Sequence, residues 1–166
     1  EMAEERFAGE RLLAIGFAET ATAIGAALAY GAKNVHFYCT TTRESLFLSS
    51  YLFFSESHSH AQEQRLVLDR LTQALTLTDR IVFVEDEVTT GNTITHLIDA
   101  LRTAFPGLPL NFGVLSLLNS MEDTRLREWE AQGIPVGFLH RIPQQYRVEE
   151  IEGYAYPSLE GMAPVY

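Results

Sequence analysis

Short hydrophobic runs recur along the chain, and segments with a helical spacing of hydrophobic residues separate them. The clearest run is Arg80–Glu85 (RIVFVE), whose unbroken apolar stretch predicts a buried strand. Four further runs predict strands at Arg11–Gly16, Asn34–Thr40, Leu110–Leu118 and Val136–His140.

Three segments between these strands have the spacing or composition of helices. The first opens at Thr20 and stops near Gly31, and a polar helix is expected over Asp123–Gln132. The third, Asn92–Phe105, carries one hydrophobic stripe formed by Ile94, Leu97, Ile98 and Leu101. Strands that alternate with helices predict a doubly wound α/β fold, with a mainly parallel central sheet of about five strands.

Two stretches give no firm secondary structure. Residues 41–60 are rich in Ser and Thr with apolar islands, and residues 62–78 are compatible with a strand at 65–69 followed by a helical turn or two. The part after Pro143 has no helical period. We therefore expect one domain over residues 1–142 and an irregular tail over 143–166, which begins or docks a partner domain.

Composition narrows the classes of ligand and location. The 166-residue chain has a net charge of −10, and Lys33 is its only lysine, so it has no general attraction for nucleic acid. No apolar run is long enough to span a bilayer, and the acidic N-terminus does not resemble a secretory signal. The single cysteine, Cys39, lies in an apolar run and is expected to be a buried thiol rather than a nucleophile. These features predict a cytoplasmic protein.

The segment Ile81–Thr93 (IVFVEDEVTTGNT) combines an apolar strand, two adjacent carboxylates, a loop of small residues and the start of a helix. Ligands of α/β sheets bind at the carboxyl ends of the strands. Gly91 lets backbone amides and the helix N-terminus approach a phosphate, so we assign 5-phosphate binding to Thr89, Thr90, Gly91, Asn92 and Thr93. The other interpretation is an ordinary strand–turn–helix with an N-capping threonine.

The two carboxylates suit the other end of a ribose phosphate. Glu85 and Asp86 can accept hydrogen bonds from vicinal hydroxyl groups, directly or through hydrated Mg²⁺. A phosphate site beside a diol site describes a ribose 5-phosphate.

This segment resembles the signature of the type I phosphoribosyltransferases, which bind 5-phosphoribosyl 1-diphosphate (PRPP). Glu87 departs from the family pattern, which has an apolar residue there. The string EDEVTTGNT is most similar to the phosphoribosyltransferase-like proteins of tellurite-resistance and stress-response gene clusters. Three further segments carry the same resemblance: Gly16–Ala21, Thr41–Glu44 and Glu56–Ala61.

The resemblance implies Mg²⁺-dependent transfer of ribose 5-phosphate from PRPP to a small-molecule acceptor, usually a ring nitrogen, with release of diphosphate. It implies a diphosphate site at Phe17, Ala18, Glu19 and Thr20, with Arg43 as a clamp on the leaving group. Glu19 either reaches diphosphate through the metal or complements the helix dipole, and Arg43 could instead be an ordinary surface arginine.

His58 and His60 fall where the family keeps a loop over the active site, so they are candidate catalytic residues. They could donate to diphosphate, act as acid or base, bind a metal in a stress protein, or simply be solvated. A homodimer and a C-terminal partner domain, in the same chain or another, are further expectations. The alternative function is a non-catalytic PRPP or nucleotide sensor that regulates a partner.

Overall fold

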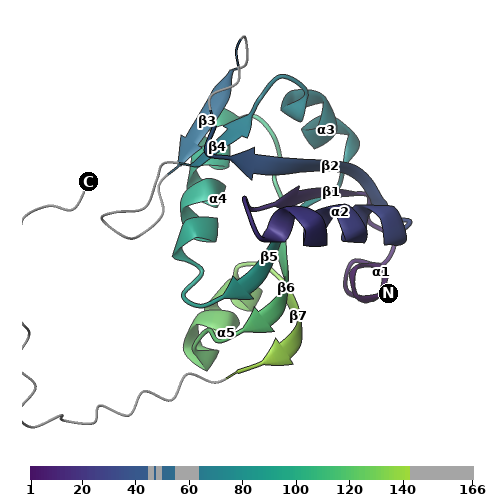
Figure 1. The fold of residues 1–166 in the computed structure, drawn as a ribbon, viewed down its shortest axis with the longest axis vertical. Coiled ribbons are helices and arrows are strands. Elements are labelled where there is room, and N and C mark those ends of the chain that lie inside the picture. Colours follow the sequence, from purple (N-terminus) through teal and green to yellow (C-terminus); the bar gives the residue numbers. More distant parts are fainter. Residues whose placement is uncertain (45–46, 48–49, 55–63, 143–166) are drawn as a thin grey trace, which may run out of the picture.

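The computed structural model describes residues 1–44, 47, 50–54 and 64–142. Within these residues, seven strands form one sheet in the order β3-β4-β2-β1-β5-β6-β7 (Figure 1). The strands are β1 (Leu12–Gly16), β2 (Val35–Thr42), β3 (Tyr51–Phe54), β4 (Gln64–Val67), β5 (Arg80–Val88), β6 (Phe112–Asn119) and β7 (Val136–Arg141).

Five of these strands, β1, β2, β5, β6 and β7, are parallel, while β3 and β4 form an antiparallel hairpin at one edge. Helices cover both faces of the sheet (Figure 1). One face packs against α1 (Met2–Arg6) and α2 (Ala21–Gly31), and the other against α3 (Leu71–Leu77), α4 (Asn92–Ala104) and α5 (Asp123–Ala131). The predicted doubly wound α/β class is confirmed.

The sequence prediction missed several elements. The hairpin strand β3 lies in the stretch left unassigned, and the short helix α1 was not expected at all. Strand β5 runs three residues further than Glu85, so the adjacent carboxylates lie within the strand rather than just beyond it. The cause is pairing with β6, which continues to Val88 opposite Asn119.

Two hydrophobic clusters hold the layers together. The larger one joins β1, β5 and β6 to α3, α4 and α5, and it includes the predicted helix stripe with Leu97 and Leu101 fully buried. The smaller one lies under α1, where Phe7 is 1% exposed, and joins that helix to Val82 and Leu115. Burial of Phe7 explains why an acidic N-terminal segment is nevertheless helical, because such a short helix is stable only through packing.

Ion pairs hold the strands at the amino edge of the parallel sheet. Arg11, just before β1, donates from its side chain to both carboxylate oxygens of Asp79 at 2.9 and 3.1 Å. Arg80, at the start of β5, pairs with Glu10 at 2.5 Å and donates to the Phe112 carbonyl at 2.6 Å. These contacts fix the starts of β1, β5 and β6 relative to one another.

Candidate active site

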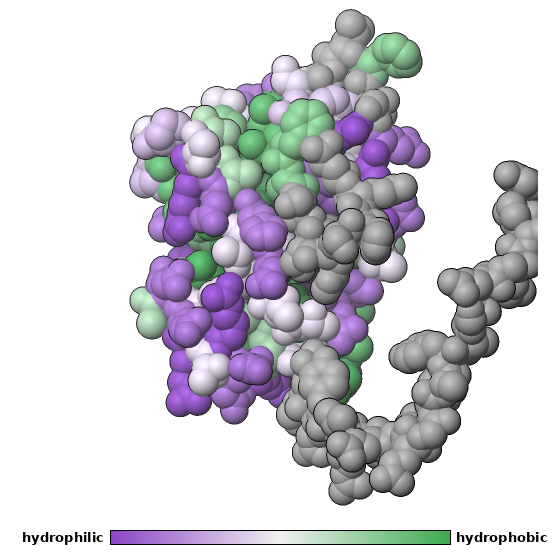
Figure 2. Space-filling view, turned by 90° about the vertical axis from the view of Figure 1, so that its left-hand side faces the viewer, coloured by the Kyte–Doolittle hydropathy of each residue, from purple (hydrophilic) through white to green (hydrophobic). Residues whose placement is uncertain are grey.

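The predicted site segments that the structure describes, those at the ends of β1, β2 and β5, lie at the carboxyl edge of the parallel sheet. Gly16 at the end of β1 lies opposite Thr40 of β2 on one side and Val84 of β5 on the other. Strands β2 and β5 continue past this level, to Thr42 and Val88, so the segments that follow the three strands leave the same edge of the sheet at different heights. Figure 2 looks onto this side of the molecule, where hydrophilic residues cover much of the lower half and hydrophobic residues gather nearer the top.

The predicted phosphate loop joins β5 to α4. Gly91 precedes the helix with φ 74° and ψ 9°, in the left-handed region that favours glycine. The amide of Asn92 donates to the Thr90 hydroxyl at 3.3 Å, and no side chain caps the helix by hydrogen bonding. The first turn of α4 contains no acidic residue, so the helix itself places no counter-charge at its positive end. The loop thus has the geometry of an anion site, with Thr89, Thr90 and Asn92 exposed and Thr93 partly exposed.

The underside of this loop packs against α5. A Cβ on Gly91 would lie 2.6 Å from the Trp129 ring and 3.4 Å from the Met121 methyl carbon. Trp129 is 2% exposed, and Arg125 stacks over its ring at 5.6 Å. Arg125 also donates to the Thr95 hydroxyl at 3.0 Å, which ties α5 to α4. Gly91 is therefore required for packing, a reason that the sequence did not reveal, and this adds to the predicted approach of a ligand.

The three carboxylates of the motif differ in exposure. Glu85 and Asp86 are partly buried, whereas Glu87 is exposed. Glu87 accepts a hydrogen bond from the Ser120 hydroxyl at 3.4 Å, across the gap between β5 and the loop after β6. Exposure at this position explains how the chain tolerates a carboxylate where the signature has an apolar residue.

The segment predicted to bind diphosphate lies between β1 and α2, and much of it is engaged within the protein. The Phe17 ring is 1% exposed and packs on Phe54 and Phe83, while its amide donates to the Val84 carbonyl at 3.2 Å. The Ala18 amide donates to the Thr41 hydroxyl at 2.8 Å, and the peptide bond between Ala18 and Glu19 is cis. Glu19 and Thr20 are exposed, and no acceptor among the described residues binds their amides. Of the four predicted residues, only these two present donors to a ligand.

Thr41 is a site residue whose role the sequence did not show. It is 2% exposed, accepts from Ala18, and donates to the Gln64 side-chain oxygen at 2.6 Å. One hydroxyl thus joins the end of β2, the segment after β1 and the start of β4. Thr41 was noticed only as part of the segment that contains Arg43, and nothing in the local pattern indicated its partners.

Arg43 follows β2 directly and is exposed at the same edge. The other two predicted catalytic residues, His58 and His60, lie outside the described residues. A second arginine, Arg141 at the end of β7, was not predicted. It donates to Asn119 and to the Met121 carbonyl, and it pairs with Asp123 at 2.6 Å. These contacts fix the loop between β6 and α5, whose Met121 packs beside Gly91.

Among the residues that the structure describes, no group of three or more His, Cys, Asp or Glu side chains could hold a metal ion. Glu85 and Asp86 could supply two carboxylate ligands, which fits Mg²⁺, an ion usually bound by one or two carboxylates together with substrate oxygens and water. No described helix is long and apolar enough to cross a membrane.

Comparisons with known proteins agree with this architecture. A model of the phosphoribosyl transferase family matches residues 2–142. The fold is similar to APRTase from Giardia lamblia complexed with 9-deazaadenine, with a TM-score of 0.60 and 12% identity over 86% of this chain and 76% of that one. Adenine phosphoribosyltransferase from Rhodothermus marinus gives a TM-score of 0.58 and 15% identity over 85% and 75%. Orotate phosphoribosyltransferase from Mycobacterium tuberculosis gives 0.50 and 16% over 85% and 69%. No curated protein sequence matches the chain.

The mainly parallel sheet with helices on both faces places the chain among the doubly wound α/β proteins. More specifically, the chain belongs to the phosphoribosyl transferase family, and its class of activity is phosphoribosyl transfer.

Proposed function

We propose that the chain binds PRPP with Mg²⁺ and transfers ribose 5-phosphate to a nitrogen nucleophile, releasing diphosphate. The observation that carries this proposal is the placement of EDEVTTGNT. Its carboxylates lie near the end of a central strand, and its glycine turn opens a helix whose first turn contains no acid. The bound base analogue in the Giardia relative supports a heterocyclic acceptor, while the adenine and orotate enzymes of this fold leave its identity open.

We assign each group of PRPP to a segment at the carboxyl edge of the parallel sheet. The 5-phosphate is bound by the exposed hydroxyls of Thr89 and Thr90 and by amides of Gly91 and Thr93, at the positive end of α4. The Asn92 amide donates to the Thr90 hydroxyl and holds the loop in this form. The ribose diol donates to Glu85 and Asp86, either directly or through water on the metal.

Diphosphate lies at the neighbouring segment after β1. The free amides of Glu19 and Thr20 donate to it, and Arg43 approaches from the end of β2. Phe17 and Ala18 take a different part, because their amides are already bonded to Val84 and Thr41. We assign to them the support of the segment rather than contact with the ligand.

In the reaction the bond from ribose C1 to diphosphate breaks and the bonding pair leaves with diphosphate, while the nitrogen lone pair forms the new C–N bond. Mg²⁺, when bound, neutralises charge on the leaving group. The donors from Glu19, Thr20 and Arg43 stabilise that charge as it develops. His58 and His60 are proposed as further donors or as the acceptor of the nitrogen proton.

Calorimetry with PRPP, with and without Mg²⁺, tests the binding step, and release of diphosphate in the presence of adenine or orotate tests the reaction. Asp86→Asn should weaken PRPP binding by about tenfold or more without lowering the melting temperature. Asp99→Asn, an equal change of charge on the exposed side of α4, is the control and should leave binding unchanged. Mg²⁺-independent binding, or unfolding of the Asp86→Asn variant, would contradict these roles. PRPP binding with no diphosphate release for any acceptor would favour a sensor.

The finer classification rests on the motif and on the three other segments that carry the same resemblance. EDEVTTGNT supports a place in the tellurite-resistance and stress-response branch, and the composition supports a cytoplasmic location. A homodimer and a partner domain after residue 142 belong to the same proposal. Sedimentation of the purified chain would test the dimer.

A further inference from the structure

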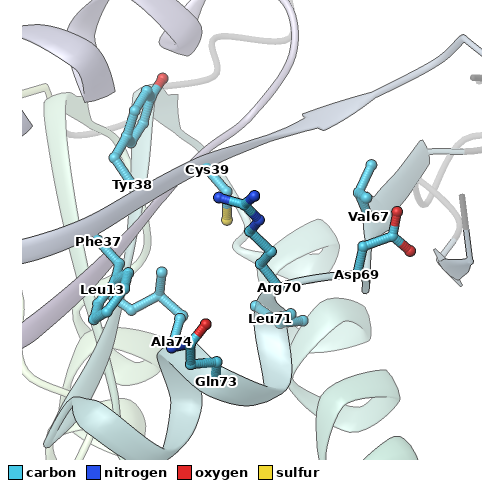
Figure 3. A pocket seen from close by; sticks show the side chains of 10 residues that line it. All are labelled: Leu13, Phe37, Tyr38, Cys39, Val67, Asp69, Arg70, Leu71, Gln73 and Ala74. Carbon is cyan, nitrogen blue, oxygen red and sulfur yellow. The ribbon is translucent and has the colours of Figure 1, made fainter.

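A cavity of about 500 Å³ lies between β2 and α3, beside the start of that helix (Figure 3). It exists because β4 covers only the last part of β2. The two strands pair at Thr41–Leu66 and Thr42–Arg65, whereas the first half of β2 has no neighbour on that edge among the described strands. Helix α3 lies across this gap without filling it.

The inner wall of the cavity is hydrophobic. It is formed by Leu13 of β1, Phe37 and Cys39 of β2, and Leu71 and Ala74 of α3. Leu13 is 1% exposed, while Phe37 and Cys39 are partly exposed because the cavity opens beside them. A cavity of this size admits a small organic molecule, and aromatic and aliphatic walls of this kind suit an apolar one.

The mouth of the cavity carries polar side chains from the start of α3, namely Asp69, Arg70 and Gln73. The Arg70 side chain extends from the helix start toward β2 (Figure 3). Among the arginines that the structure describes, Arg70 alone has no ion pair, hydrogen bond or ring contact through its side chain. That distinction matters in a chain with a net charge of −10, where carboxylates outnumber cations.

We propose that this cavity is a binding site for a small carboxylic acid with an aromatic or aliphatic body. The body lies against Phe37, Leu71 and Ala74, and the carboxylate pairs with the planar guanidinium of Arg70. The nearby Asp69 carboxylate favours a singly charged anion over a phosphate dianion, since it would repel the second charge. The site is independent of PRPP binding, because none of its lining residues belongs to the loops at the carboxyl edge.

The probe is 2-naphthoate, titrated by calorimetry into the full chain, with the uncharged 2-naphthamide as its matched analogue. Cys39, the only cysteine in the chain, lies in the wall and reports occupancy without mutation. Burial raises the pKa of the Cys39 thiol to about 12, so its alkylation by iodoacetamide is slow and is followed by intact mass at alkaline pH, where more thiolate is present. The alkylation should slow further as 2-naphthoate is added, with half-protection at the calorimetric Kd measured at the same pH. The amide should bind about fivefold more weakly, as expected for loss of a partly exposed ion pair.

Two variants test the named contacts. Arg70→Gln should weaken 2-naphthoate binding about fivefold and remove the preference over the amide, whereas the control Arg127→Gln on α5 should change neither. Ala74→Leu should abolish binding by filling the cavity, and its melting curve shows whether it folds. If the Ala74→Leu variant does not fold, Arg70→Gln and the protection of Cys39 still test the proposed site.

Absence of saturable binding at millimolar probe would overturn the proposal. Binding that leaves Cys39 unprotected would place the probe elsewhere and would also overturn it. Equal affinity for the acid and the amide would show that Arg70 does not recognise an anion there. The proposed function would survive each of these outcomes, because PRPP binding is measured separately.

Discussion

Replacement of Gly91 by alanine tests the contact between the phosphate loop and α5. Two costs arise from the structure. The left-handed backbone, φ 74°, costs a residue with a Cβ about 1–2 kcal/mol. The new Cβ would also lie 2.6 Å from the Trp129 ring, and overpacking of this kind costs about 1–3 kcal/mol. We therefore expect Gly91→Ala to lower the free energy of unfolding by about 2–5 kcal/mol.

Gly133 supplies a matched control. Its φ of 75° is nearly the same, but nothing lies within 4 Å of the position that a Cβ would occupy. Gly133→Ala should therefore cost only the backbone term, about 1–2 kcal/mol. Urea unfolding followed by far-UV circular dichroism gives both values, and the difference between them is the cost of the Trp129 contact.

A double-mutant cycle with Trp129→Leu isolates the same contact. The smaller side chain leaves room for a Cβ, so Gly91→Ala should cost about 1–3 kcal/mol less in the Trp129→Leu background. Equal costs for Gly91→Ala and Gly133→Ala, or additive effects in the cycle, would refute the reasoning. The loop would then be able to shift away from α5 without loss.

Three further predictions concern other parts of the chain. Thr41→Val should lower the free energy of unfolding by about 1–3 kcal/mol, because it leaves the partly buried Ala18 amide without its acceptor, and it should weaken diphosphate binding in a competition titration. Hydrogen bonds from Arg11 lower the pKa of Asp79 to about 2. Because the folded-state pKa is depressed, this stabilisation is present above the ordinary value near 4 and is lost as pH falls toward 2, so unfolding of Asp79→Asn should depend less on pH in that window. Alanine at both His58 and His60 should reduce turnover more than PRPP affinity, in parallel kinetic and calorimetric assays; equal losses in both would contradict a role for the histidines in the chemical step.

The parallel core of the fold could be predicted from the sequence because its strands and helices are strongly patterned. Helix α4 could be recognised from the helical period of its hydrophobic stripe, and β5 from its unbroken apolar run. The hairpin did not, since β3 and β4 have four residues each and their stability comes from packing of Phe54 and Leu66 in the core. Helix α1 was hidden for a similar reason, because its stability depends on Phe7 beneath the sheet.

The sequence indicated the part of the candidate site whose residues form one continuous segment. The motif around Gly91 was found because its residues are neighbours in sequence. The contacts that support the site could not be predicted, because Thr41, Trp129 and Arg141 lie on three other elements and reach the site only in the folded structure. The segment after β1 shows the same limit, since its position was indicated by the pattern but the partners of its amides depended on the fold.

The ion pairs at the amino edge align the strands at the end of the sheet opposite the proposed ligand site. Arg11 with Asp79, and Arg80 with Glu10 and the Phe112 carbonyl, fix the starts of β1, β5 and β6. The residues proposed to bind PRPP lie at the opposite ends of β1, β2 and β5, so strand alignment and ligand recognition depend on separate sets of side chains. An exposed position at the carboxyl edge that has no proposed contact with PRPP, such as Glu87, can therefore be randomised to seek a new acceptor while the scaffold keeps its register. Trp129 is an exception that should be kept, because its buried ring packs both in the core and against Gly91 of the loop.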